Sequence, residues 1–145
     1  MADMLLIQGA NMQWLGRRQP ELYGTMTPGE LDEMVRAHAG GLGVTLDIVY
    51  TAHEGSAIES VYGAYEAGVR GLVMNPAGFT YNGDALRDAI LGCEGLHYIE
   101  VHMSNLAKRD MRSRLVAAAD GMIMGFGANG YLLALDGMAA LLGRR

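Results

Sequence analysis

The chain alternates short apolar runs with longer segments in which apolar residues recur at helical spacing. The runs have the length of buried strands and lie at residues 4–9, 44–51, 71–75, 98–103 and 121–127. Between them, apolar residues recur at i, i+3 and i+4, and a last segment of this period covers residues 129–142. Strands covered on both faces read as continuous apolar runs, so the alternation predicts an α/β fold. We expect a doubly wound parallel sheet of five strands with helices on both faces.

The first helical segment has a clear start. Thr27 can cap the helix, Pro28 suits its first turn, and Glu30 completes a capping box. We expect a helix in each crossover, including one that carries the basic cluster at residues 108–114. The size and order of the elements predict one flavodoxin-like domain, residues 1–145, whose ligand crevice lies beyond the carboxyl ends of the strands.

Composition narrows the class of protein without naming a function. The chain has 145 residues, half of them hydrophobic and 19% charged, which is typical of a soluble globular protein. No apolar run approaches the ~20 residues that span a bilayer. The single cysteine, Cys93, allows no internal disulfide and favours the cytoplasm. The net charge of -5, with no basic tail, argues against nucleic acid as a partner.

Polar side chains follow the predicted strands at their carboxyl ends, most sharply at the fourth strand. Because side chains alternate along a strand, Glu100, His102 and Ser104 share one face, while residues 99, 101 and 103 take the other. A carboxylate beside an imidazole can set its tautomer and favour its protonated form, which would make His102 a proton donor. The alternative is a structural Glu–His pair near the end of the sheet.

The loop after the first strand, LGRRQPELYG, places two arginines close to a phenol. A phenol acts as a base only when its phenolate is stabilised, and a neighbouring guanidinium does this. The chemical interpretation is a Tyr23 base activated by Arg18. The alternative is a solvated basic turn.

A third cluster, at residues 108–114, contains three arginines. One or two of these, together with Ser104, could bind a carboxylate near a helix N-terminus. The alternative is the solvated face of a helix.

Several motifs resemble those of the type II 3-dehydroquinate dehydratases, over essentially the whole chain. The first stretch, QGANMQWLGRRQPELYG, is similar to the family's NGPNLNLLGxREPxxYG. Further blocks match in order: HEG at 53–55, NPAGFT at 75–80, ALRDA at 85–89, EVHMSN at 100–105 and GFGANGYLLAL at 125–135. The resemblance implies a flavodoxin-like fold and a hydro-lyase.

The family dehydrates 3-dehydroquinate to 3-dehydroshikimate by trans elimination, without metal or organic cofactor. The resemblance implies that Tyr23 removes the C2 proton and that Arg18 activates it. Asn11 would hold the water that stabilises the enolate. His102, oriented by Glu100, would protonate the departing C1 hydroxyl.

The resemblance also implies a set of groups that bind a carboxylate substrate. These are Asn75, the backbone of Met103 with Ser104, and an arginine after the fourth strand. The segment between residues 109 and 121 is about three residues shorter than in the family, so either Arg112 or Arg114 could supply that arginine. We favour Arg112.

Departures from the family pattern fall in the substrate-binding groups rather than the acid–base set. Tyr81 stands where the family has a substrate-binding histidine.

Asp88 matches a residue that, in the family, reaches the site of a neighbouring subunit. This match implies a homo-oligomer, and family members are typically dodecamers of trimers. Two alternatives stay open: a lyase or isomerase acting on another cyclic hydroxy ketone or hydroxy acid, and a non-catalytic binding protein on the same scaffold.

Overall fold

The computed structural model describes residues 2–144 and contains a parallel sheet of five strands in the order β2-β1-β3-β4-β5. The strands are β1 (Met4–Ala10), β2 (Leu46–Tyr50), β3 (Gly71–Ala77), β4 (His97–His102) and β5 (Gly121–Met124). Every neighbouring pair is parallel, with β1, β3 and β4 in the interior of the sheet. The predicted α/β fold with a doubly wound parallel sheet is confirmed.

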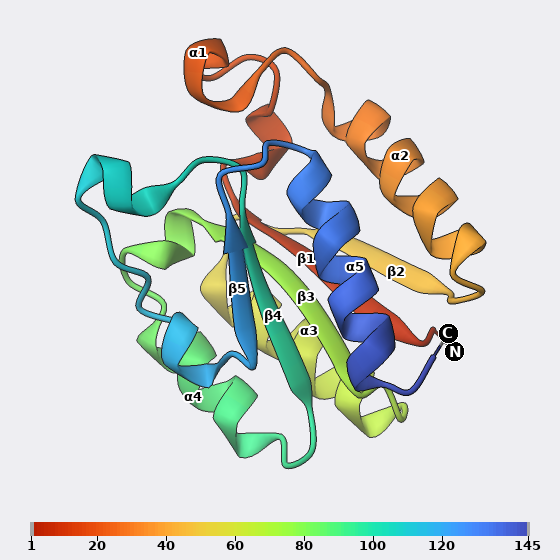
Figure 1. The fold of residues 1–145 in the computed structure, drawn as a ribbon. Helices are drawn as coiled ribbons and strands as arrows, with labels where there is room; N and C mark the ends of the chain where they lie inside the picture. Colours follow the sequence, from red (N-terminus) through yellow and green to blue (C-terminus); the bar gives the residue numbers. More distant parts are fainter. Residues whose placement is uncertain (1, 145) are drawn as a thin grey trace.

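Helices cover both faces of the sheet (Figure 1). One face carries α2 (Pro28–Gly41) and α5 (Asn129–Leu141), and the other carries α3 (Glu54–Glu66) and α4 (Asp84–Gly92). A short α1 (Pro20–Tyr23) stands above one end of the sheet. The start predicted for α2 is confirmed, because Thr27 Oγ1 accepts from the Glu30 amide and Glu30 Oε1 accepts from the Thr27 amide.

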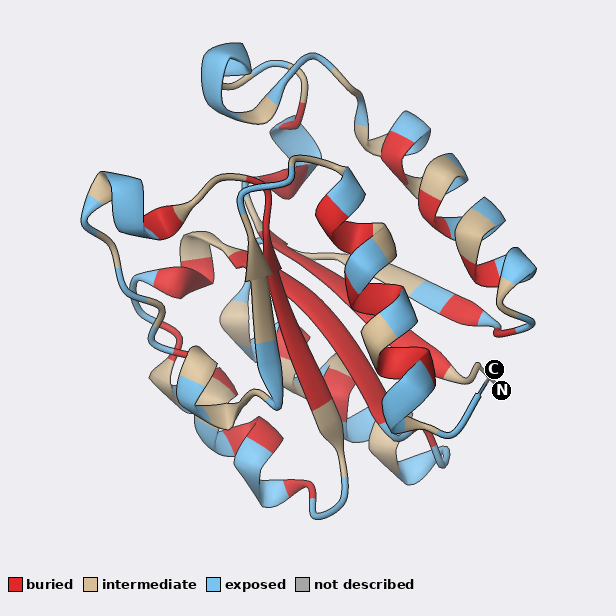
Figure 2. Cartoon of the chain, viewed as in Figure 1, coloured by how far each residue is buried: buried red, intermediate tan, exposed pale blue. Residues whose placement is uncertain are grey.

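The core divides into two apolar layers, one on each side of the sheet. Along β1, Leu6 packs in the layer under α2 and α5, while Leu5 and Ile7 pack in the layer under α3 and α4. The interior strands are buried along most of their length (Figure 2). Their continuous apolar runs in the sequence follow from this two-sided burial.

The fifth strand is shorter than its apolar run suggested. It ends at Met124, because Gly125 and Gly127 adopt positive φ angles of 99° and 58°, outside the range of an extended strand. The turn that they form leads directly into α5.

The helix expected between β4 and β5 is absent from the described chain, and that expectation was wrong. The crossover contains two short 3₁₀ turns instead, η3 (Leu106–Arg109) and η4 (Val116–Ala118). Asp110 adopts a left-handed conformation with φ 55° and ends η3. Leu115 is fully buried and anchors the segment to the core, which leaves too few residues between the two points for a helix.

Candidate active site

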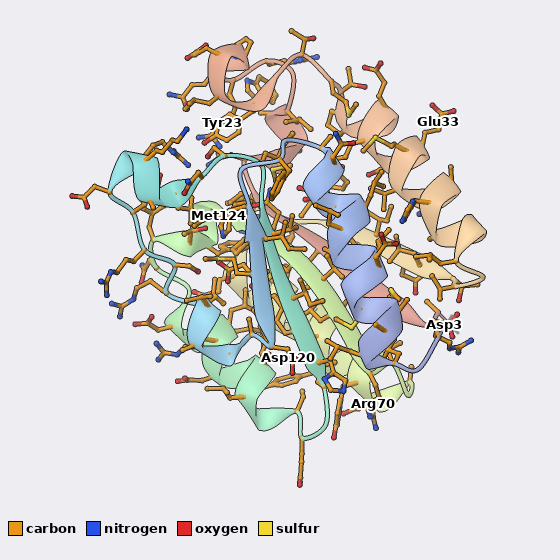
Figure 3. The ribbon with its side chains drawn as sticks, in the orientation of Figure 1. Asp3, Tyr23, Glu33, Arg70, Asp120 and Met124 are labelled. Atoms are coloured by element: carbon orange, nitrogen blue, oxygen red, sulfur yellow. The ribbon has the colours of Figure 1, made fainter. Side chains whose placement is uncertain are left out.

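A pocket of about 530 Å³ lies beyond the carboxyl ends of β1, β3 and β4. In Figure 3, Tyr23 marks this end of the molecule, and Asp120 and Arg70 mark the opposite end. The three strands are adjacent in the sheet, so the loops that follow them meet at one place. The polar residues that line the pocket are Asn11, Arg18, Tyr23, Asn75, Thr80, Tyr81, His102, Ser104 and Arg109.

The loop after β1 brings the first predicted pair into this pocket. The guanidinium carbon of Arg18 lies 4.9 Å from the centroid of the Tyr23 ring. Leu15, which is buried, holds the start of the loop in the core, and Tyr23 packs against the same apolar layer. Gln19 takes a left-handed conformation, with φ 39°, and this turns the chain into α1 so that Tyr23 faces back over the sheet.

The end of β4 brings the second predicted pair. Nε2 of His102 lies 2.6 Å from Oε2 of Glu100. Glu100 is fully buried and His102 is 5% exposed, and only His102 of the two lines the pocket. Glu100 therefore lies behind the imidazole ring, and His102 stands between it and the pocket.

Sequence reasoning missed a third member of this strand face, Tyr98. Its hydroxyl donates to Oε1 of Glu100 at 2.7 Å. Burial, and then the negative charge of Glu100, raise the pKa of the Tyr98 phenol well above its usual range. The signal in the sequence was position, since Tyr98 stands two residues before Glu100 on the same strand.

Asn75 at the end of β3 is held by a buried polar network that the sequence did not reveal. Its amide Nδ2 donates to the Tyr131 hydroxyl at 2.8 Å, and Tyr131 donates to Oε1 of Gln8 at 2.7 Å. Asn75 Oδ1 accepts from the Ala77 amide at 3.0 Å. Burial raises the pKa of the Tyr131 phenol. The partners lie on β1 and α5, far apart in sequence, so only the fold could bring them together.

The floor of the pocket has an unusual backbone. Asn11 is left-handed with φ 84°, and Ala77 has φ 49° and ψ -116°, a region costly for alanine. A Cβ at Gly78 would lie 2.9 Å from the Cβ of Ala10 and 3.3 Å from Nδ2 of Asn11. The turn after β3 therefore needs a glycine next to the loop that carries Asn11.

The arginine that enters the pocket after β4 is Arg109. Its Nη2 donates to Oγ of Ser104 at 3.0 Å, and its guanidinium carbon lies 6.0 Å from the centroid of the Tyr23 ring. Nε of Arg109 is buried, with no hydrogen-bond partner within residues 2–144. The backbone of Met103, together with Ser104, lines the same side of the pocket.

Neither of the two arginines expected from the sequence, Arg112 and Arg114, is among the residues that line this pocket. Arg112 is exposed and does not line the pocket. Arg114 forms a two-point ion pair with Asp84 at the start of α4, at 2.9 and 2.6 Å. η3 ends at the left-handed Asp110, and Met111 is the last residue of the crossover that lines the pocket.

Tyr81 and Asp88 occupy different surroundings. Tyr81 lines the pocket but is 63% exposed, and its hydroxyl lies 3.8 Å from Sδ of Met111. Asp88 is exposed on α4, pairs with Arg87 at 3.3 Å, and does not line the pocket of its own chain.

Among residues 2–144, no three His, Cys, Asp or Glu side chains are grouped in a way that could hold a metal ion. No helix in the same range has the length and apolar character needed to cross a bilayer.

Comparison with known proteins gives the family. Residues 2–139 match the family described as Dehydroquinase class II. The chain belongs to the class II dehydroquinase family. This membership identifies it as a hydro-lyase, an enzyme that removes water from its substrate.

Named relatives and solved structures agree with this assignment of a class II dehydroquinase. A protein named 3-dehydroquinate dehydratase from Xanthomonas oryzae pv. oryzae is 41% identical over 145 residues, covering 98% of this chain and 97% of its own. The type II dehydroquinase structure from Butyrivibrio crossotus has a TM-score of 0.90 at 30% identity, covering 93% of this chain and 95% of that one. The structure from Propionibacterium acnes has a TM-score of 0.89 at 32% identity, covering 97% and 98%.

Proposed function

We propose that this class II dehydroquinase converts 3-dehydroquinate to 3-dehydroshikimate and water by trans elimination, with Tyr23 as base and His102 as acid. The observation that carries the proposal is that both side chains line one pocket. Tyr23 lies in the segment that follows β1, and His102 is the last residue of β4. The name of the Xanthomonas relative, 3-dehydroquinate dehydratase, supports the choice of substrate.

The base side of the reaction rests on Arg18 and Tyr23. The guanidinium carbon of Arg18 lies 4.9 Å from the centroid of the Tyr23 ring, and Tyr23 removes the proton from C2 of the substrate. The electrons of the broken C–H bond move into the ketone and give an enolate. Asn11 lines the pocket and binds a water molecule that donates a hydrogen bond to the enolate oxygen.

The acid side rests on Glu100 and His102. Nε2 of His102 is engaged with Glu100, so Nδ1 is the ring nitrogen left to exchange a proton with the substrate. As the enolate collapses, the C1–O bond breaks and His102 protonates the departing hydroxyl, which leaves as water. The Glu100 carboxylate holds the imidazole ring in the orientation that leaves Nδ1 for the substrate.

The substrate carboxylate is bound on the side of Arg109. Among the described residues that line the pocket there are two arginines and no aspartate or glutamate, so the pocket is positive in a protein of net charge -5. The guanidinium of Arg109, together with Ser104 and the backbone of Met103, presents donors to an anion. Asn75 and Tyr81 contact the ring hydroxyls.

Assembly into a homo-oligomer belongs to the same proposal. Asp88 is exposed on α4 and outside its own chain's pocket, which suits a residue that completes the site of a neighbouring subunit. We expect a dodecamer of four trimers, and the mass of the purified protein in solution tests this.

The experiment is an ultraviolet assay in which the purified protein is mixed with 3-dehydroquinate and the conjugated enone of the product is followed. We expect turnover by the unmodified protein. Tyr23→Phe removes the base and His102→Ala removes the acid, so each should lower kcat by at least ~100-fold. A protein that forms no enone, or variants that retain full kcat, would refute the proposal.

A further inference from the structure

Three side chains on one face of β4 form a continuous chain of hydrogen bonds that ends at the pocket. The Tyr98 hydroxyl lies 2.7 Å from Oε1 of Glu100, and Oε2 of Glu100 lies 2.6 Å from Nε2 of His102. Tyr98 and Glu100 are fully buried, and His102 is almost so. This series of hydrogen bonds therefore runs from the core to His102, the one of the three side chains that lines the pocket.

The direction of the first hydrogen bond is set by the environment of Tyr98. Burial and the nearby carboxylate raise the pKa of this phenol, so it keeps its proton and is the donor. Glu100 is then the acceptor at Oε1, and its remaining oxygen, Oε2, is the one that faces His102. The phenol thereby fixes the plane of the carboxylate.

We propose that Tyr98 is a positioning residue for the acid of this enzyme: its hydroxyl orients Glu100 and limits how strongly that carboxylate holds the proton of His102. A donor at Oε1 withdraws charge from the carboxylate, so less of it is concentrated at Oε2. The inference rests on the proposed function only in taking His102 as the acid.

Other titratable groups lie near both ends of this series of hydrogen bonds. On the pocket side, the groups that share the lining with His102 are Arg18, Tyr23, Tyr81 and Arg109. At the other end, Asp120 before β5 accepts from the backbone amide of Tyr98 at 2.9 Å, and Cys93 after α4 lies in the same apolar layer. All of them remain when only the Tyr98 hydroxyl is removed, so a difference in titration reports the loss of that hydroxyl.

The first test is Tyr98→Phe, which keeps the ring in the core and deletes the donor. We expect kcat to fall about tenfold, with KM changed less than about twofold, because the residue does not touch the substrate. The alkaline limb of the kcat profile should move to higher pH, since Glu100 without its donor holds the shared proton more tightly. A merely structural role would lower stability and leave that limb in place, and this result would overturn the inference.

The second measurement needs no turnover. In ligand-free protein with ¹⁵N-labelled histidine, the ring nitrogens of His102 are followed by NMR as the pH is changed. We expect their midpoint to lie at higher pH in Tyr98→Phe than in the unmodified protein. A shifted midpoint in a protein that does not dehydrate 3-dehydroquinate would refute the proposed function and leave this inference standing. An unshifted midpoint in an active enzyme would do the reverse.

Two further variants fix the interpretation. Tyr65→Phe deletes a hydroxyl that donates to the Glu94 carbonyl at 2.6 Å, away from the pocket, and should leave both readouts unchanged. Tyr98→3-fluorotyrosine makes the phenol a stronger donor, so both the alkaline limb and the His102 midpoint should move to lower pH. This opposite shift keeps the inference testable if Tyr98→Phe folds poorly, and its absence would count against it.

Discussion

Replacing Arg109 by alanine gives the sharpest test of how the pocket binds its substrate. The guanidinium of Arg109 is tied to Ser104 at 3.0 Å and has a buried Nε with no partner within residues 2–144. A hydrogen bond between charged groups contributes ~1.5–3 kcal/mol. Its loss should therefore lower kcat/KM for 3-dehydroquinate by roughly 10- to 150-fold. Arg109→Lys keeps the charge but loses the planar fork of the guanidinium. Its kcat/KM should therefore lie between that of the unmodified protein and that of Arg109→Ala.

The matched controls are the two neighbouring arginines. Arg112→Ala removes an exposed cation outside the pocket, and Arg114→Ala breaks the surface ion pair with Asp84. Both should keep kcat/KM within about twofold, because screened surface charges contribute little. The assay is enone formation at several substrate concentrations, with circular dichroism to show that each variant is folded. If Arg112→Ala lost activity while Arg109→Ala kept it, the assignment of Arg109 would be refuted.

Two further predictions concern the backbone and a helix cap. Ala77→Gly should raise the free energy of unfolding by ~1 kcal/mol, because glycine adopts φ 49° and ψ -116° without the steric cost that alanine meets; a urea titration with an unchanged or lower midpoint would contradict this. The hydrogen bond from the Thr27 amide lowers the pKa of the Glu30 carboxyl, so its stabilisation is complete above the ordinary value of 4.5 and is lost as pH falls through the lowered value. Glu30→Gln should therefore be less stable than the unmodified protein at pH 7, and the difference in urea midpoints should shrink at acid pH; a difference that stays constant with pH would contradict the capping argument.

Much of the proposed acid–base set was accessible from the chain alone because its placement depends on local geometry. Glu100 and His102 lie two residues apart on a strand, and alternation of side chains is enough to place them on one face. Arg18 and Tyr23 lie five residues apart in one loop. Such a short stretch of chain keeps the guanidinium and the phenol near each other. The resemblance to type II dehydratases then supplied roles for these residues that spacing could not.

The arginine that lines the pocket after β4, Arg109, was not accessible in this way. Residues 106–118 form two short 3₁₀ turns and no α-helix. The path of this segment depends on its contacts with other elements. Arg114 forms an ion pair with Asp84 on α4, and Leu115 is buried in the core. Arg109 donates a hydrogen bond to Ser104. Position along the chain favoured Arg112, whereas the turn at Asp110 directs it into solvent.

The amino-acid sequence by itself determined the strands, the two-sided burial of the sheet and the chemistry available at its carboxyl edge, because each of these depends on neighbouring residues and their period. The tertiary structure decided which distant side chains support that chemistry: Tyr131 and Gln8 behind Asn75, and Arg109 across from Tyr23. Such contacts join segments separated by tens of residues, and only packing of the whole chain fixes the distances between them.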